Sequence, residues 1–297
     1  TAIGYTALYS ISGSDGEEGE ANTALGYRAG YSTTTGNSNT FIGNSAGYEN
    51  TTGMDNVFIG AGAGQHTTTA NQSTYIGWYA GYYQQVGGNN VVIGHQALYG
   101  ATGKANSANN NVAVGYQAGY GSDAGHGITA VGSGALRLIS DSGSLSTAIG
   151  YYSGYYASGS YNTFLGAQAG VGGTTSAPYS SGHSNTAVGY QALDAFTTAP
   201  GNTAVGRSAL GAVTTGDYNV GLGYAAGGGL TSGYTNVAIG YNALSADSQA
   251  FSTVAVGQSA AGLQNLGAVT SYNTAIGSGA QYRNLNTGIH MTTVGAQ

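Results

Sequence analysis

The side chains able to do chemistry are few in this 297-residue sequence, and they are scattered. Carboxylates gather at one place, Asp15, Glu17, Glu18 and Glu20, where several oxygen ligands could hold a hard cation. We interpret this segment as a solvated acidic loop, because the sequence lacks the Gly-Gly-x-Gly-x-Asp pattern of calcium-binding repeats. The remaining acidic residues stand singly in expected turns, so the sequence suggests no carboxylate pair for glycoside hydrolysis.

Histidine, serine and glycine give no stronger signal of catalysis. The five histidines show no metal-ligand spacing such as His-x3-His, and no Gly-x-Ser-x-Gly elbow precedes an expected helix. The glycine-rich stretch at 60–64 lacks the lysine of a phosphate-binding loop. The sequence therefore predicts no catalytic residue, no metal site, no cofactor and no enzymatic activity.

Tyrosine is the informative excess, with 25 copies. Many tyrosines stand one or five residues after a recurring glycine, which favours stacked aromatic columns that stiffen the fold. Phenolic rings also offer a large contact area at low entropic cost, so the densest clusters are candidates for recognising a sugar or a protein. These candidate recognition residues are Tyr82, Tyr83, Tyr151, Tyr152, Tyr155 and Tyr156.

Composition narrows the class of protein further. Charged residues make up 5% of the chain, against about 25% in an ordinary soluble domain, and cysteine is absent. The net charge of −6 argues against a nucleic-acid partner, which requires clustered cations. No apolar run approaches the roughly 20 residues that span a bilayer, so we expect no membrane insertion of this segment. The sequence opens inside a repeat and without a start methionine, and we interpret it as a piece of a longer protein.

One short phrase recurs along the whole chain, and its glycine follows Ile, Val or Leu in all 17 copies. Nine of the 16 spacings between these glycines are 17 residues. The residue three before the glycine is Thr or Val in every copy, and Asn stands four before it in 11 of 16 copies. Because the regularity covers the chain from end to end, we expect a single repeat domain over 1–297.

The Thr/Val–x–Ile/Val alternation predicts a short strand with one buried face, and the glycine permits the turn that follows. A repeat of this length has room for two short strands and their turns. The sequence therefore predicts an all-β, parallel β-solenoid of about 17 coils, on the order of 80 Å long. We expect the Thr/Val and Ile/Val/Leu side chains to point inward and the residue between them, most often Ala, to point outward.

The recurring asparagine has a fixed place relative to the strand. Stacked coils would set these side chains in a ladder of amides that satisfies backbone groups at a tight corner. The structural repeat positions singled out are Asn22, Gly26, Asn39, Gly43, Asn56, Gly60, Asn185, Gly189, Asn202, Gly206, Asn236, Gly240, Asn273 and Gly277.

A single stack of such coils buries little apolar area per residue and would be marginal alone. Small outward residues would permit the close approach of another chain. We therefore expect identical chains to associate side by side, with three as the favoured number.

The phrase Asn-Thr-Ala-Val-Gly-Tyr-Gln-Ala-Leu at 185–193, with Thr-Thr-Gly-x-x-Asn at 51–56 and 214–219, resembles repeats of phage tail-fibre proteins. It is also similar to the Asn-Ser-Val-Ala-Ile-Gly repeats of trimeric autotransporter adhesin heads, although the present repeat is longer and its turns are richer in threonine. The resemblance implies a homotrimeric, left-handed parallel β-roll outside a cell or on a virion, with a role in adhesion or fibre structure.

The leading hypothesis is a non-catalytic extracellular fibre segment of the phage tail-fibre type, which attaches to a cell-surface glycan or protein receptor. One alternative is a bacterial surface adhesin or filament subunit, and another is a polysaccharide depolymerase. An ice-binding solenoid is disfavoured because its threonines must face outward. Four longer repeats carry insertions that suggest contact loops or tolerated drift, at 10–21, 100–110, 171–184 and 262–272.

Overall fold

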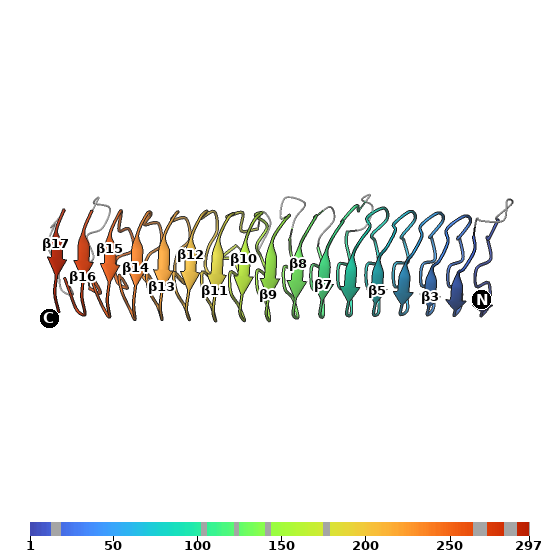
Figure 1. Cartoon of the computed structure of the whole chain (residues 1–297), viewed down its shortest axis with the longest axis horizontal. Coiled ribbons are helices and arrows are strands. Elements are labelled where there is room, and N and C mark those ends of the chain that lie inside the picture. Colours follow the sequence, from blue (N-terminus) through green and yellow to red (C-terminus); the bar gives the residue numbers. More distant parts are fainter. Residues whose placement is uncertain are drawn as a thin grey trace. The chain divides into compact units, whose positions relative to one another are not determined.

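The computed structural model of the chain describes residues 1–12, 19–101, 106–121, 125–139, 144–174, 179–263, 272–281 and 290–296. Within these ranges it contains seventeen strands and no helix. The chain divides into two compact units, Thr1–Ser146 and Thr147–Gln297. In each unit the strands pair in parallel and in register with the strands of neighbouring repeats, which confirms the predicted β-solenoid (Figure 1). Most of the acidic cluster (Asp15, Glu17 and Glu18) and the central parts of the four insertions lie outside the described residues.

Every strand coincides with one copy of the repeat phrase. The strands of the first unit are β1 (Ala2–Ile3), β2 (Thr23–Leu25), β3 (Thr40–Ile42), β4 (Val57–Ile59), β5 (Thr74–Ile76), β6 (Val91–Ile93), β7 (Val112–Val114) and β8 (Thr129–Val131). Those of the second unit are β9 (Thr147–Ile149), β10 (Thr163–Leu165), β11 (Thr186–Val188), β12 (Thr203–Val205), β13 (Val220–Leu222), β14 (Val237–Ile239), β15 (Val254–Val256), β16 (Thr274–Ile276) and β17 (Thr292–Val294).

The expectation of two strands per repeat is wrong. One three-residue strand forms in each complete repeat, and the remaining residues follow a series of turns that return the chain to the next strand. Outside the named strands, the described residues form only isolated bridges such as Gln84 with Asn106 and Tyr234 with Phe251. The Gly- and Thr-rich composition between strands favours turns over a second extended segment.

The predicted direction of the strand side chains is also wrong. From β2 to β16 the middle residue is buried, whereas the two flanking residues are half-buried or exposed. Ala204 is fully buried between neighbouring coils, while Leu165 and Leu222 are each 46% exposed. The strand centres line the interior, whether alanine as at Ala204 or aromatic as at Phe58, and the aliphatic flanking side chains remain on the surface of the sheet.

The interior is filled by compensation between two positions of the same repeat. Where the strand centre is aromatic, as at Phe58, the residue six further on is glycine, here Gly64; a Cβ there would lie 2.7 Å from the ring. Where the centre is alanine, the same later position carries a buried leucine in some repeats, as at Ala204 with Leu210. Both pairs fill a similar volume, which close packing of a protein interior requires. In other repeats, such as that of Ala24 with Gly30, the later position is glycine, and Phe41 of the next coil fills the space.

The repeat glycine is required by a close approach of backbones. Gly206 has a φ of +128°, and a Cβ added to it would lie 2.5 Å from the carbonyl oxygen of Gly223 in the next coil. The same relation joins Gly26 to Gly43 and Gly43 to Gly60. Positive φ alone would tolerate other residues at some cost, but the neighbouring carbonyl excludes any side chain.

The asparagine ladder is present in both units. The backbone N–H and the Nδ2 of Asn39 both donate to Oδ1 of Asn22, at 2.9 and 3.1 Å, and Nδ2 of Asn39 also donates to the Gly53 carbonyl at 2.8 Å. Asn56 repeats these contacts on Asn39. Each buried amide thus holds the turn of its own coil and the backbone of the next, as buried polar groups require.

One buried phenol gives stability a dependence on alkaline pH. Tyr75 at the centre of β5 is fully buried, and burial raises its pKa from 10.0 to about 12, against opposing hydrogen bonds with Ser73 and Asn90. Because the pKa is higher in the folded state, the neutral phenol contributes its full stability below pH 10 and loses it as the pH rises toward 12. We expect this group to remove about 3 kcal/mol of unfolding free energy across that window.

The variant Tyr75→Phe isolates this effect, since Phe58 shows that the position accepts phenylalanine. Urea unfolding of both proteins across the alkaline window should show a smaller decline in the variant. Equal declines would contradict the assignment.

Candidate functional site

After each strand comes the repeat glycine, and the side chains of interest stand one, two and five residues after that glycine in every coil. The residue two after the glycine adopts a left-handed backbone conformation, with φ of 55° at Tyr79 and 53° at both Gln96 and Gln117. Because successive coils stack in register, side chains at each position form rows that run across the coils. These rows bring the candidate tyrosines together with residues far from them in the sequence.

In the first unit the residues after β5 form a dense aromatic cluster. Trp78 stacks on Tyr79 with ring centroids 4.7 Å apart, and Tyr79 lies 4.5 Å from Tyr82. Tyr82 meets Tyr83 edge to face at 4.6 Å. Trp78 is 50% exposed, while the three tyrosines are half-buried. The candidate pair Tyr82–Tyr83 is therefore part of a larger surface that includes the single tryptophan.

Two rows extend this cluster onto the following coils. Tyr82 stacks on Tyr99 at 5.3 Å, and Tyr99 stacks on Tyr120 at 5.0 Å with an interplanar angle of 1°. The guanidinium of Arg137 ends this row, 5.2 Å from the Tyr120 ring centroid. The faces of these rings are covered by their stacked neighbours, so the rings present their edges and hydroxyl groups to solvent. The stacked column supports the structural reading of these tyrosines.

The second row starts at Trp78 and continues through two further rings. His95 lies 4.7 Å from Trp78, and Tyr116 stacks on His95 at 5.3 Å. Tyr116 is 52% exposed.

A row of glutamine side chains stands two residues after the repeat glycine, between the two aromatic positions in the sequence. Nε2 of Gln117 donates to Oε1 of Gln96 at 2.8 Å, and Nε of Arg137 donates to Oε1 of Gln117 at 2.7 Å. Gln117 is only 9% exposed. We call the two aromatic rows and this amide row, with Tyr79 and Tyr83, the first aromatic strip.

Burial affects the phenols of this strip. It raises the pKa of Tyr99 to about 12, with neighbouring tyrosines acting in the same direction. Burial also raises the pKa of Tyr82, although a hydrogen bond with Gln65 acts against it. Both hydroxyl groups therefore remain protonated near neutral pH and can donate hydrogen bonds.

The second unit carries a related arrangement after β9. Tyr151 stacks on Tyr152 at 4.0 Å, Tyr152 lies 4.7 Å from Tyr155, and Tyr155 meets Tyr156 at 4.7 Å. A hydrogen bond with Tyr152 raises the pKa of Tyr151.

Amides follow on the next two coils of this unit as well. Nε2 of Gln191 donates to Oε1 of Gln168 at 3.2 Å, and both residues have left-handed backbones with φ of 54° and 57°. We call Tyr151, Tyr152, Tyr155, Tyr156, Gln168 and Gln191 the second aromatic strip. Asp194 stands here at the position that Tyr120 occupies in the first unit, and burial raises the pKa of its carboxyl group.

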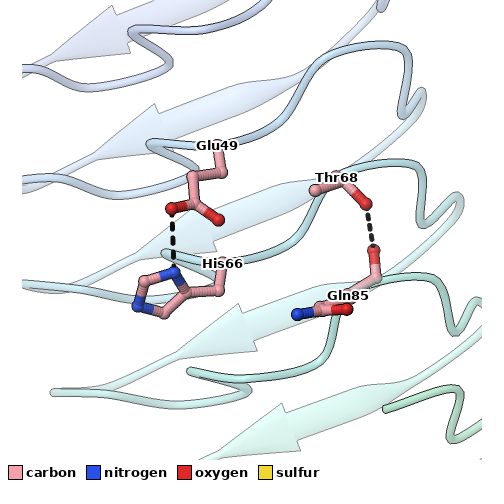
Figure 2. A network of polar contacts seen from close by, with 4 residues as sticks. All are labelled: Glu49, His66, Thr68 and Gln85. Carbon is pink, nitrogen blue, oxygen red and sulfur yellow. Dashed lines mark hydrogen bonds and ion pairs between the residues drawn. The ribbon is translucent and has the colours of Figure 1, made fainter. Parts of the chain in front are cut away.

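An ion pair and a threonine hydrogen bond lie on turns next to the first strip, and Figure 2 shows both contacts. Nδ1 of His66 lies 3.0 Å from Oε1 of Glu49 on the preceding coil, and the imidazole stacks on Tyr83 at 5.0 Å. Two residues after His66 on the same turn, Oγ1 of Thr68 donates to the backbone carbonyl of Gln85 at 3.0 Å. This contact links adjacent coils and explains the threonine-rich turns as structural.

Sequence reasoning missed Trp78, the glutamine rows and the arginines. Arg207 lies between two rings, with its guanidinium 5.6 Å from the centroids of both Tyr190 and Tyr224. One signal was available: the segments 78–83 and 151–156 share the pattern aromatic-aromatic-x-Gly-aromatic-aromatic. A count of tyrosine alone does not reveal the tryptophan variant of that pattern.

Among the described residues, no group of three or more His, Asp or Glu side chains could hold a metal ion. The same part of the chain contains no helix long and apolar enough to cross a bilayer. Comparisons with protein-family models, curated proteins and solved structures found no match for this chain.

Proposed function

We propose that this chain is a non-catalytic segment of an extracellular fibre, in which identical chains associate side by side and present the aromatic strips for attachment. A phage tail-fibre-like role in host adhesion is the first candidate, and a bacterial surface adhesin or filament is the alternative. Three chains is the number that the resemblance of the repeats implies. The observation that carries the proposal is the outward face of the sheet.

We define the outer sheet face as the first and third residues of the strands within one unit. In the second unit Leu165 and Leu222 are each 46% exposed and Ile149 is 40% exposed. None of the seventeen strands contains a charged residue. A monomer that left the continuous aliphatic row of third residues in water would forgo the free energy of burying it.

An identical chain is the occupant that fits this face. The rows repeat once per coil and in register, as shown by the pairing of Val205 with Leu222 and of Leu222 with Ile239. A partner must match that period over many coils, and a second copy does so by construction. With charged residues at 5% of the chain, little electrostatic repulsion opposes the contact. This face replaces the outward alanines first expected to mediate association.

Association is tested by the mass of the purified chain in dilute buffer. We expect sedimentation or light scattering to give a multiple of the 29.4 kDa chain mass, and three times that mass for a trimer. A stable monomer would contradict the proposal.

The variant Leu222→Lys tests which face is used. A buried, unpaired lysine is costly at an interface, so we expect it to weaken association by at least about tenfold while the single chain stays folded. Tyr218→Lys is the matched control, because Tyr218 lies in the same coil, is 61% exposed and stands outside the strand. Equal loss of association in both variants would remove the outer sheet face from the proposal.

Ice binding becomes a second candidate because the Thr/Val position of the strands faces outward, contrary to the expectation that disfavoured it. An ordered, uncharged row of threonine and aliphatic side chains is the surface that such a function requires. Thermal hysteresis of a monomeric chain would favour this candidate, whereas an oligomer without hysteresis would favour the fibre.

A further inference from the structure

We infer that the two aromatic strips are binding sites for neutral, pyranose-containing glycans, and that each chain carries two of them. This inference deepens the attachment role and rests on it for its biological meaning. It does not depend on the side-by-side association of chains.

The first argument is the pairing of aromatic rings with fixed hydrogen-bonding groups. A pyranose ring has a face of C–H groups that packs on an aromatic surface and a rim of hydroxyl groups that needs polar partners. Trp78 offers a half-exposed ring, and ring contacts join it through Tyr79 to Tyr82, whose hydroxyl group can donate and accept hydrogen bonds. Such sites combine large apolar contact with a few placed polar groups.

The second argument is that the amides are held in place before any ligand arrives. Gln117 is nearly buried, and its side chain both donates to Gln96 and accepts from Arg137. Gln96 is half-buried and accepts this hydrogen bond through its Oε1, so its amide nitrogen keeps its capacity to donate to a ligand. A side chain that is already ordered loses less entropy on binding.

The third argument is recurrence. The aromatic quartet and the following pair of left-handed glutamines occur in both units, at 78–117 and at 151–191. Stacking alone does not require the amides. The rings of Tyr9, Tyr31 and Tyr48 also stack, with centroids 5.2 Å apart. The glutamine positions of those coils are occupied by Thr6, Arg28 and Ser45. The combination of both features marks the strips.

Charge selects the kind of glycan. The chain has a net charge of −6 and only five Lys and Arg residues, so it does not attract sialylated or sulfated chains electrostatically. Arg137 brings one positive charge to the end of the first strip, where its Nε is engaged by Gln117, and Glu49 brings a negative charge to the same strip. Asp194 adds a carboxyl group beside the second strip. Neutral oligosaccharides are therefore the expected ligands.

The test uses the full chain on an array of neutral and acidic oligosaccharides, followed by calorimetric titration with the best neutral hit. We expect two sites per chain. Trp78→Ala and Tyr152→Ala should each reduce the stoichiometry to one, and the double variant should bind at least about tenfold more weakly.

Tyr224→Ala is the matched control. Tyr224 occupies the same repeat position as Trp78 and stacks on Tyr241 at 5.3 Å, but it is followed by Ala225 instead of a hydrogen-bonding or aromatic residue. Its variant should keep both sites. Binding of acidic glycans only, no binding at all, or unchanged binding in the double variant would overturn the inference. An oligomer that binds no glycan would overturn the glycan sites and leave the proposed fibre association intact. A monomer that binds neutral glycans would support the glycan sites and contradict the fibre association.

Discussion

Replacing Gly206 with alanine is expected to lower the free energy of unfolding by about 4 kcal/mol. Its Cβ would lie 2.5 Å from the Gly223 carbonyl oxygen and 2.7 Å from the carbonyl carbon, so two adjacent coils would have to separate. The positive φ of +128° adds a conformational cost. Urea unfolding followed by circular dichroism measures the effect.

Gly295→Ala separates the two costs. Gly295 has nearly the same φ, +133°, but no atom lies within 4 Å of an added Cβ, because no described coil follows it. This variant should lose only the conformational part, about 1–2 kcal/mol. If Gly206→Ala were no more destabilising than Gly295→Ala, the close approach of the coils would not explain the repeat glycine.

Removing one rung of the amide ladder should have a similarly large effect. In Asn219→Leu, the backbone N–H of Asn236 would lose its acceptor, now at 3.0 Å, and the Gly233 carbonyl would lose its donor, now at 2.8 Å. Both groups are buried, and each unpaired group costs about 1–3 kcal/mol. We expect a loss of about 4 kcal/mol in the free energy of unfolding.

The chain provides the control for this variant. Ser73 stands at the asparagine position in the first unit, and its Oγ accepts from the Asn90 backbone N–H at 3.3 Å. Asn219→Ser should therefore keep an acceptor for Asn236 and lose about half as much stability. Equal losses in the serine and leucine variants would show that shape, and not hydrogen bonding, governs this position.

The class of fold could be predicted from the sequence because the repeat places the same residue types at the same point of every coil. The asparagine ladder followed from the same periodicity. The periodicity could not show which face of the strand is buried, because a period of two identifies two faces without distinguishing the inner one from the outer one. The exchange of Phe58 with Gly64 for Ala204 with Leu210 carried that information, since compensation in size occurs only between side chains that share an interior.

The candidate site was predictable in part. The tyrosine clusters were identified from their density, but their neighbours come from other coils, 17 to 23 residues away. Gln96 and Gln117 are 21 residues apart and meet only because an insertion separates β6 from β7 without shifting their register. A linear reading does not show that such insertions leave the stacking intact.

The pairing of Phe58 with Gly64 inside one repeat affects how a chain built of such repeats can change in length. A copy that fills its own share of the interior, such as that of Phe58 and Gly64, can be duplicated without leaving a void, whereas deleting the copy of Leu210 would empty the space beside Gly221 and Gly227. The number of coils is then an inherited and adjustable quantity, which unequal recombination within the gene changes by whole repeats.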